Sequence, residues 1–226
     1  MFPDKFTCDI CGVETFGTNL CPDCLKTVSF NDFAVCPVCG RKTFRPEICL
    51  ECKAQPPPYK RGVSALVYEN GGAVLISKFK RGSAYLKEYF ADLIAAKLRD
   101  FPRLDCIIYV PMTEKSKKSR GYNQTELLAR ALSERINVPV LLGAAVKIKQ
   151  TAEQKNLSAK ERIENLKGCF KIAEREKLAG KRVLVLDDVL TTGATAAELC
   201  RTALAAGAAE VYFACAASVE YKQPNG

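Results

Sequence analysis

Residues 183–198, VLVLDDVLTTGATAAE, give the clearest indication of how this chain folds. The first half of this stretch is a continuous apolar run, as expected for a strand that is buried on both faces of a parallel sheet. Two adjacent carboxylates, Asp187 and Asp188, follow this run, and a helical pattern begins a few residues later. Because ligands of parallel α/β sheets bind at the carboxyl ends of the strands, the stretch predicts a ligand site.

The turn between this strand and its helix has two chemically different parts. Hydroxyls, a glycine and free backbone amides at the start of a helix favour a phosphate dianion. Carboxylates repel that phosphate but accept hydrogen bonds from nearby sugar hydroxyls. The turn therefore predicts a site for a ribose 5-phosphate, and the alternative is a purely structural acidic strand end before a capped helix. The residues expected at the phosphate are Thr191, Thr192, Gly193, Ala194 and Thr195.

Strands and helices alternate around this stretch from residue 62 onward. Apolar runs and period-two patterns predict strands at 62–68, 105–111, 139–142, 168–172, 181–188 and 209–218. Amphipathic patterns predict helices at 83–100, 123–136 and 195–207. Continuous apolar strands separated by helices predict an α/β domain with a parallel sheet and helices on both faces.

Eight of the 12 cysteines form four Cys-x-x-Cys pairs near the amino terminus, and each of the first four cysteines recurs 28 residues later. The chain has no histidine, so a zinc site must be built from thiolates or carboxylates. Two Cys-x-x-Cys turns complete one closed tetrathiolate site, which predicts two structural zinc ions. We favour ligation within each repeat, and a cross-braced pairing is the alternative. The expected ligands are Cys8, Cys11, Cys21, Cys24, Cys36, Cys39, Cys49 and Cys52.

These observations divide the chain into a small cysteine-rich unit at 1–57 and a large domain at 58–226. The prolines of AQPPPYKRG, residues 54–62, predict a semi-rigid spacer that holds the small unit at a fixed distance. Of the net charge of +9, all the basic excess lies beyond residue 60, so an anionic ligand should meet the large domain first. The sequence contains no apolar run of about 18 residues. With reduced thiols and no export signal, we expect a cytoplasmic protein.

Residues 183–198 resemble the phosphoribosyl-pyrophosphate (PRPP) binding motif of type I phosphoribosyltransferases. Two further segments, VPMTEKSKKSRGYNQ at 110–124 and QTAEQKNLSAKERIENLKGCF at 150–170, are similar to the ComF family of competence-associated proteins. An amino-terminal double zinc ribbon belongs to the same family's layout. The resemblance covers nearly the whole chain. It implies a type I phosphoribosyltransferase fold, PRPP recognition, and a role in bringing transforming single-stranded DNA into the cytoplasm.

The resemblance also assigns residues by position. It implies a pyrophosphate loop at Pro111, Met112 and Thr113. It further implies an Arg-Gly-aromatic-Asn-Gln segment at Arg120, Gly121, Tyr122, Asn123 and Gln124. A mobile loop that closes over the ligand would contain Thr151, Gln154, Leu157, Arg162 and Asn165. The expected catalytic residues are Asp187, Asp188, Arg120 and Lys115, with Lys78 and Lys80 as further cations for pyrophosphate.

The sequence departs from the family pattern at two of these positions. Many relatives have a histidine where Thr113 stands and an arginine where Lys115 stands. A hydroxyl and an ammonium group can still bind pyrophosphate, so binding is expected to survive better than an acid or base role.

Three functions remain open at this point. The protein transfers phosphoribose from PRPP, with magnesium, to an acceptor; or it is a catalytically silent PRPP sensor or single-stranded DNA scaffold; or its ribbons dock a helicase or uptake component.

Overall fold

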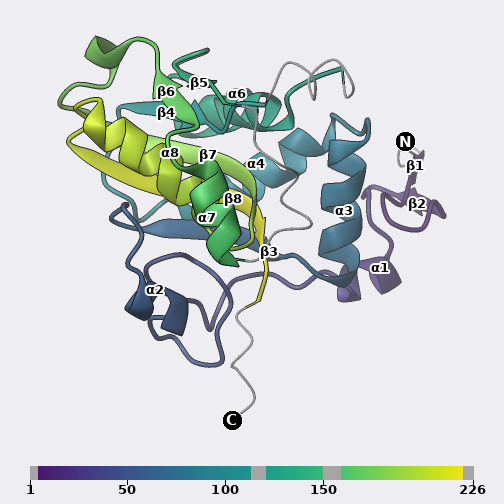
Figure 1. Cartoon of the computed structure of the whole chain (residues 1–226). Coiled ribbons are helices and arrows are strands. Elements are labelled where there is room, and N and C mark those ends of the chain that lie inside the picture. Colours follow the sequence, from purple (N-terminus) through teal and green to yellow (C-terminus); the bar gives the residue numbers. More distant parts are fainter. Residues whose placement is uncertain (1–4, 113–120, 150–158, 221–226) are drawn as a thin grey trace.

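The computed structural model describes residues 5–112, 121–149 and 159–220 (Figure 1). Four parallel strands form the central sheet in the order β3-β8-β7-β4. They are β3 (Gly62–Val67), β4 (Cys106–Tyr109), β7 (Arg182–Leu190) and β8 (Glu210–Ser218). All four confirm predicted strands. Strand β7 continues to Leu190, two residues beyond the predicted end at 188, so Asp187 and Asp188 lie within the strand as expected.

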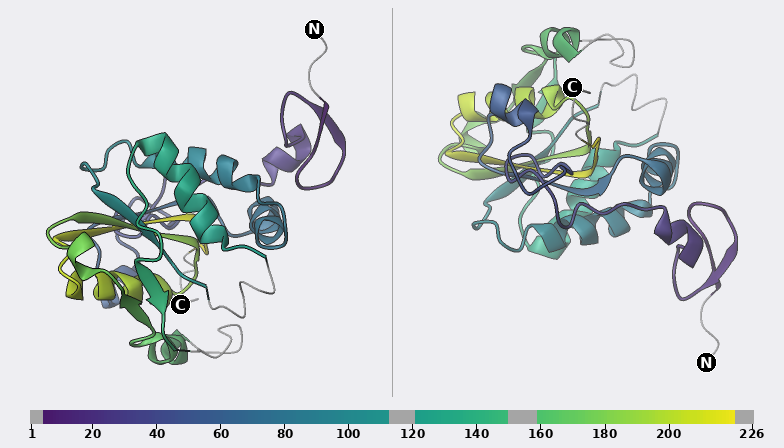
Figure 2. Two further views of the ribbon diagram at one scale, coloured as in Figure 1. Left: turned by 90° about the horizontal axis from the view of Figure 1, so that it is seen from above. Right: turned by 90° about the horizontal axis from the view of Figure 1, so that it is seen from below.

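Helices cover both faces of this sheet (Figure 2). Helices α4 (Leu86–Lys97) and α6 (Gln124–Ile136) lie on one face. Helix α8 (Ala194–Ala205) and the short helix α2 (Leu50–Ala54) lie on the other. The predicted architecture, a parallel sheet between two helical layers, is confirmed. Among the described residues, no helix has the length and apolar character that crossing a membrane requires.

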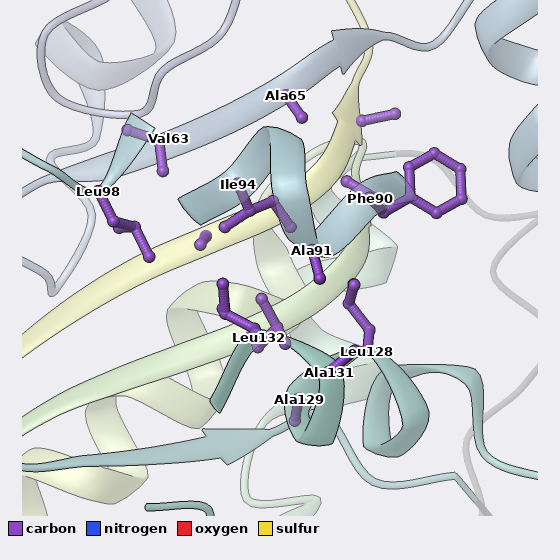
Figure 3. Packing of buried hydrophobic residues seen from close by; sticks show 14 of the residues in the cluster. Val63, Ala65, Phe90, Ala91, Ile94, Leu98, Leu128, Ala129, Ala131 and Leu132 are labelled. Atoms are coloured by element: carbon purple, nitrogen blue, oxygen red, sulfur yellow. The ribbon is translucent and has the colours of Figure 1, made fainter. Parts of the chain in front are cut away.

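Each face of β7 packs into its own part of the core. Leu184 and Leu186 belong to the cluster on the side of α4 and α6, whereas Val183 and Val185 belong to the cluster on the side of α8. This alternation follows from the period of two in a strand. Figure 3 shows the first cluster, in which side chains of β3 meet those of α4 and α6. Its labelled members include Val63, Ala65, Phe90, Ala91, Ile94, Leu128 and Leu132.

Helix α3 (Asn70–Lys80) follows β3 and was not predicted. Its first residues are Asn70, Gly71 and Gly72, which are typical of a turn rather than a helix. The glycine at 72 is needed for close packing, because a Cβ there would lie 2.4 Å from the carbonyl oxygen of Val67. Tertiary contact therefore overrides the local preference of this segment.

Two of the predicted strands lie elsewhere than in the main sheet. Residues 139–142 form only a single parallel bridge, between Val140 and Ile107 of β4, so the prediction of a short strand there was wrong. The segment predicted at 168–172 forms β6 (Phe170–Ile172), which pairs antiparallel with β5 (Ala145–Lys147) in a separate two-stranded sheet. Helix α7 (Ala159–Leu166) precedes β6, and a 3₁₀ turn, η2 (Arg175–Lys177), follows it.

The first cysteine repeat contains the hairpin β1 (Lys5–Thr7) and β2 (Glu14–Phe16) and the short helix α1 (Pro22–Lys26). It projects beyond α3 in both views of Figure 2. It contacts the large domain through a hydrogen bond from Gly71 N to Thr27 O (3.1 Å) and one from the Tyr85 hydroxyl to Asp9 (2.5 Å).

The second cysteine repeat packs directly against the sheet. Its four cysteines belong to the same buried cluster as Val185 of β7. The proline segment does not separate it from the large domain, contrary to the predicted spacer. Instead the Tyr59 ring stacks on Phe213 of β8, with centroids 5.4 Å apart, and Lys60 N donates to Val211 O (2.8 Å).

Candidate functional site

Three elements meet at the carboxylate of Asp188. Its Oδ2 accepts a hydrogen bond from Gln124 Nε2 at the start of α6 (2.8 Å). The same oxygen pairs with Lys80 Nζ at the end of α3 (3.1 Å). Asp188 is only 8% exposed, so its charge depends on these partners. The structure thus brings together three residues that the sequence placed in separate segments.

Asp187 lies on the opposite side of β7, because neighbouring side chains of a strand alternate. Its Oδ1 accepts a hydrogen bond from the backbone amide of Asp188 (2.8 Å). Burial, with a smaller effect of the Asp188 charge, raises the pKa of Asp187 to about 8. A carboxyl group that holds its proton near neutral pH can donate as well as accept a hydrogen bond.

The predicted phosphate residues form one partly exposed turn between β7 and α8. Gly193 is the N-cap of α8 with φ of 79°, a left-handed conformation that favours glycine, and it provides no side-chain cap. The Thr192 hydroxyl accepts from Ala194 N at 3.4 Å. Amides at the start of a helix point along its axis, and the helix dipole favours an anion there, so the start of α8 is a suitable position for a phosphate.

The start of the predicted pyrophosphate loop lies next to this turn. Strand β4 pairs with β7 so that Tyr109 is opposite Leu186, and Val110 N donates to Leu186 O (2.9 Å). Pro111 and Met112, both partly exposed, therefore follow at the level of the two aspartates. Thr113, Lys115, Arg120, Thr151, Gln154 and Leu157 lie outside the described residues, as does the side chain of Arg162.

Two residues of the 120–124 segment position the partners of Asp188. The Tyr122 hydroxyl donates to Phe79 O (2.5 Å) and accepts from Gly82 N (3.1 Å), so it holds the end of α3 that carries Lys80. Asn123 is the N-cap of α6, and its Oδ1 accepts from Thr125 N (3.1 Å). These contacts explain why a tyrosine and an asparagine directly precede Gln124.

The side-chain oxygen of Gln124 has no hydrogen-bond partner among the described residues. This atom, Oε1, is buried. An unpaired buried acceptor is costly, on the order of 1–3 kcal/mol, unless a ligand or water supplies a donor. The Nε2 atom of the same amide group donates to Asp188, so one polar atom of this side chain is paired and the other is not.

The cysteines form two compact groups, each from one repeat. Within each group the four Sγ atoms lie within 4.8 Å of one another. Cys11 and Cys21 are 3.8 Å apart at sulfur, and so are Cys39 and Cys49. A tetrahedral site with Zn–S bonds of about 2.3 Å has S···S edges of about 3.8 Å, so four thiolates here fit a zinc ion. This grouping agrees with ligation within each repeat and not with a cross-braced pairing.

Comparison with known proteins places the chain in a class and then in a family. The family described as "Phosphoribosyl transferase domain" matches residues 88–224. Competence protein F of Haemophilus influenzae is 33% identical over 147 residues, which cover 62% of this chain and 64%, less than two thirds, of that protein. DNA utilization protein YhgH of Escherichia coli is 33% identical over 168 residues, which cover 71% of this chain and 73% of that protein.

Among solved structures, the glutamine PRPP amidotransferase of B. subtilis is similar over 65% of this chain and 27% of its own, with 20% identity and a TM-score of 0.37. The parallel sheet, its helical layers and the matched domain define a protein of the type I phosphoribosyltransferase class. Its amino-terminal cysteine groups precede that domain. The chain belongs to the ComF family.

Proposed function

We propose that the protein binds PRPP, with magnesium, at the turn between β7 and α8. The observation that supports this most directly is Asp188, which is held between Lys80 and Gln124 beside an acceptor without a partner. A ribose hydroxyl placed there would donate to Asp188. One that reached Gln124 Oε1 would satisfy the buried acceptor.

Each part of PRPP has a counterpart in this arrangement. The 5-phosphate would bind the amides at the start of α8, where the helix dipole favours an anion. The pyrophosphate would lie over Pro111 and Met112, within reach of the Lys80 ammonium group. When bound, magnesium would neutralise part of the pyrophosphate charge, coordinated mainly by the oxygens of the ligand and by water.

The proposed reaction is transfer of the phosphoribosyl group to an acceptor. The bond between the anomeric carbon and the pyrophosphate oxygen breaks, and the pyrophosphate leaves with the bonding electrons. The residues of this chain would contribute by holding the sugar and by stabilising the leaving charge. Release of pyrophosphate from PRPP, compared between wild type and Lys80→Met, distinguishes turnover from binding alone. A PRPP sensor would bind the ligand without releasing pyrophosphate.

A second proposed function concerns single-stranded DNA, because the two relatives are named for competence and for DNA utilization. At the opposite end of the sheet, a hollow is lined by three arginines, two aspartates and Phe101. The Arg61 guanidinium lies 4.6 Å from the Phe101 ring centroid. Arginines and aromatic rings are groups that bind a phosphate backbone and its bases, and Phe101 is partly exposed. Binding to a labelled oligonucleotide should weaken steeply with salt, and a flat salt response would contradict this role.

The two cysteine groups are proposed to hold structural zinc. Both sets of four sulfurs have the spacing of a closed tetrahedral site, which leaves no position for a substrate. A helicase or uptake component is a further proposed partner, which would dock on the projecting first repeat. Deleting residues 1–27 should then abolish that interaction and leave PRPP binding intact.

A further inference from the structure

The second cysteine group reaches the phosphate turn through one side chain, that of Arg41. Its Nη2 donates to the backbone oxygen of Thr191 (2.8 Å), across 150 residues of sequence. Its Nη1 pairs with Glu51 Oε2 (2.9 Å) on α2. The Arg41 side chain is 5% exposed, so the guanidinium is buried between the cysteine group and the turn.

The backbone of Arg41 is itself part of the cysteine turn. Its carbonyl oxygen accepts from Cys36 N (2.8 Å), which closes the loop around the sulfurs. The preceding residue, Gly40, has φ of 70°, and a Cβ there would lie 2.4 Å from the Val63 Cα. Gly62 N also donates to Val38 O (2.6 Å). The group is therefore fixed against β3 at one end and against Thr191 at the other.

We infer that Arg41 is a positioning residue: through it, the second cysteine group sets the conformation of the phosphate turn. With the Thr191 oxygen fixed by a charged donor, the peptide that joins Thr191 to Thr192 cannot rotate freely. The amides at the start of α8 then keep one direction whether or not a ligand is present. The identity of the ligand at this turn rests on the proposed function. The coupling between Arg41 and the turn does not depend on that ligand.

The two cysteine repeats should differ in their effect on the phosphate turn. The first lies beside α3, on the other side of the domain, where it is hydrogen-bonded to Gly71 and Tyr85. Loss of the first group should leave the turn unchanged. The second group, by contrast, should be required for an ordered turn even in the absence of PRPP.

Amide hydrogen exchange in the full-length, metal-loaded protein tests the coupling without any ligand. In Arg41→Ala we expect exchange at residues 192–195 to rise by about tenfold or more, because a charged hydrogen bond is lost. Arg41→Lys should give an intermediate rise, since lysine can reach only one of the two oxygens. Arg45→Ala is the matched control, because Arg45 is an exposed arginine of the same repeat, and it should leave the exchange unchanged.

Glu51→Gln is a second variant for the case that Arg41→Ala fails to fold. Glu51 is 50% exposed at its side chain, so its substitution leaves the core intact while it releases one side of Arg41. We expect a smaller but measurable rise in exchange at 192–195. Exchange at these residues equal to that of wild type, in a folded Arg41 variant or in Glu51→Gln, would overturn the inference.

Calorimetry with ribose 5-phosphate and with magnesium pyrophosphate extends the test to the ligand. Arg41→Ala should weaken ribose 5-phosphate by about tenfold and leave magnesium pyrophosphate unchanged, since only the 5-phosphate meets the turn. If wild type binds neither ligand, the proposed function fails, and the exchange experiment still decides the coupling. If both ligands weaken equally, Arg41 acts on the whole domain and the inference is wrong.

Discussion

Gln124 Nε2 donates to Asp188 Oδ2 over 2.8 Å, and this contact joins the start of α6 to β7. Both residues were expected at the site, but nothing in the sequence indicates that they are in contact. The bond turns the Gln124 amide so that its oxygen, buried and without a partner among the described residues, remains for a ligand. This geometry supports the proposal that Gln124 binds the ligand as well as beginning the helix.

Replacement of Gln124 tests this assignment. Gln124→Leu removes both the donor to Asp188 and the spare acceptor, and we expect PRPP affinity to fall by about tenfold to a hundredfold, in line with loss of one or two hydrogen bonds. Gln124→Glu keeps an acceptor but places a second charge beside Asp188, so it should bind still more weakly. Calorimetry measures both. Unchanged affinity in Gln124→Leu would show that the ligand lies elsewhere.

Lys80 is expected to serve the ligand as well as Asp188. Lys80→Met leaves a nearly buried carboxylate without its cation, so we expect weaker PRPP binding, by about tenfold or more, and a lower melting temperature. Arg81, the next residue, is exposed, and Arg81→Met is the matched control for net charge. Equal losses in the two variants would indicate a general effect of charge and not a contact.

The raised pKa of Asp187 predicts how stability changes with pH. In the unfolded chain this carboxyl titrates near 3.8, and in the fold near 8. Between these values the folded protein binds more protons at this site, so the free energy of unfolding falls as pH rises from about 4 to about 8. Asp187→Asn should remove this slope and be relatively more stable at high pH. Urea unfolding at several pH values measures it, and identical slopes in both proteins would contradict the assignment.

Gly40 and Gly12 occupy equivalent positions in the two repeats and allow a matched comparison. Both have positive φ, but a Cβ at Gly40 would lie 2.4 Å from Val63 Cα, whereas at Gly12 nothing lies within 4 Å. Gly12→Ala should cost only the conformational strain, about 1–2 kcal/mol and confined to the first repeat. Gly40→Ala should cost several times more, because backbone atoms must move. Similar melting temperatures for the two variants would contradict the close contact of the second repeat.

The cysteine groups should also differ in their importance for the whole protein. Cys24→Ser should reduce the zinc content from two ions to one and leave the unfolding of the large domain unchanged. Cys36→Ser should reduce zinc equally but lower the stability of the whole chain, because Cys36 is fully buried in the core around β7. Zinc content and thermal unfolding, measured together, separate the two effects. A large domain that is equally stable in both variants would be the contrary result.

Much of the fold could be predicted because its signals are local. The apolar run that forms β7, the amphipathic pattern of α6 and the repeated cysteine spacing each depend on neighbouring residues. Helix α3 could not be predicted, since Gly72 is needed for close contact with Val67 and Gly71 for close contact with Thr27, and glycine does not favour a helix. The packing of the second repeat against β3 was also not predicted. Three consecutive prolines suggest a spacer, but in the structure Tyr59 of this segment stacks on Phe213.

At the site, residue types were easier to predict than contacts. The two aspartates and the phosphate turn could be predicted because they lie in one continuous segment, from β7 to the start of α8. Lys80 was only one of several candidate lysines, and nothing in its neighbourhood in the sequence singles it out. Arg41 gave no signal at all, because its contact with Thr191 depends on how a separate repeat packs on the sheet.

Whether PRPP binds at the end of β7 is measured by calorimetry with PRPP and magnesium, on wild type and on the double variant Asp187→Asn, Asp188→Asn. We expect one binding event per chain in wild type and a loss of affinity of at least about tenfold in the variant, since the proposed contact between Asp188 and the sugar is weakened. A melting curve of the variant confirms that it is folded. No heat of binding in wild type, or equal affinity in the two proteins, would contradict a PRPP site at the end of β7.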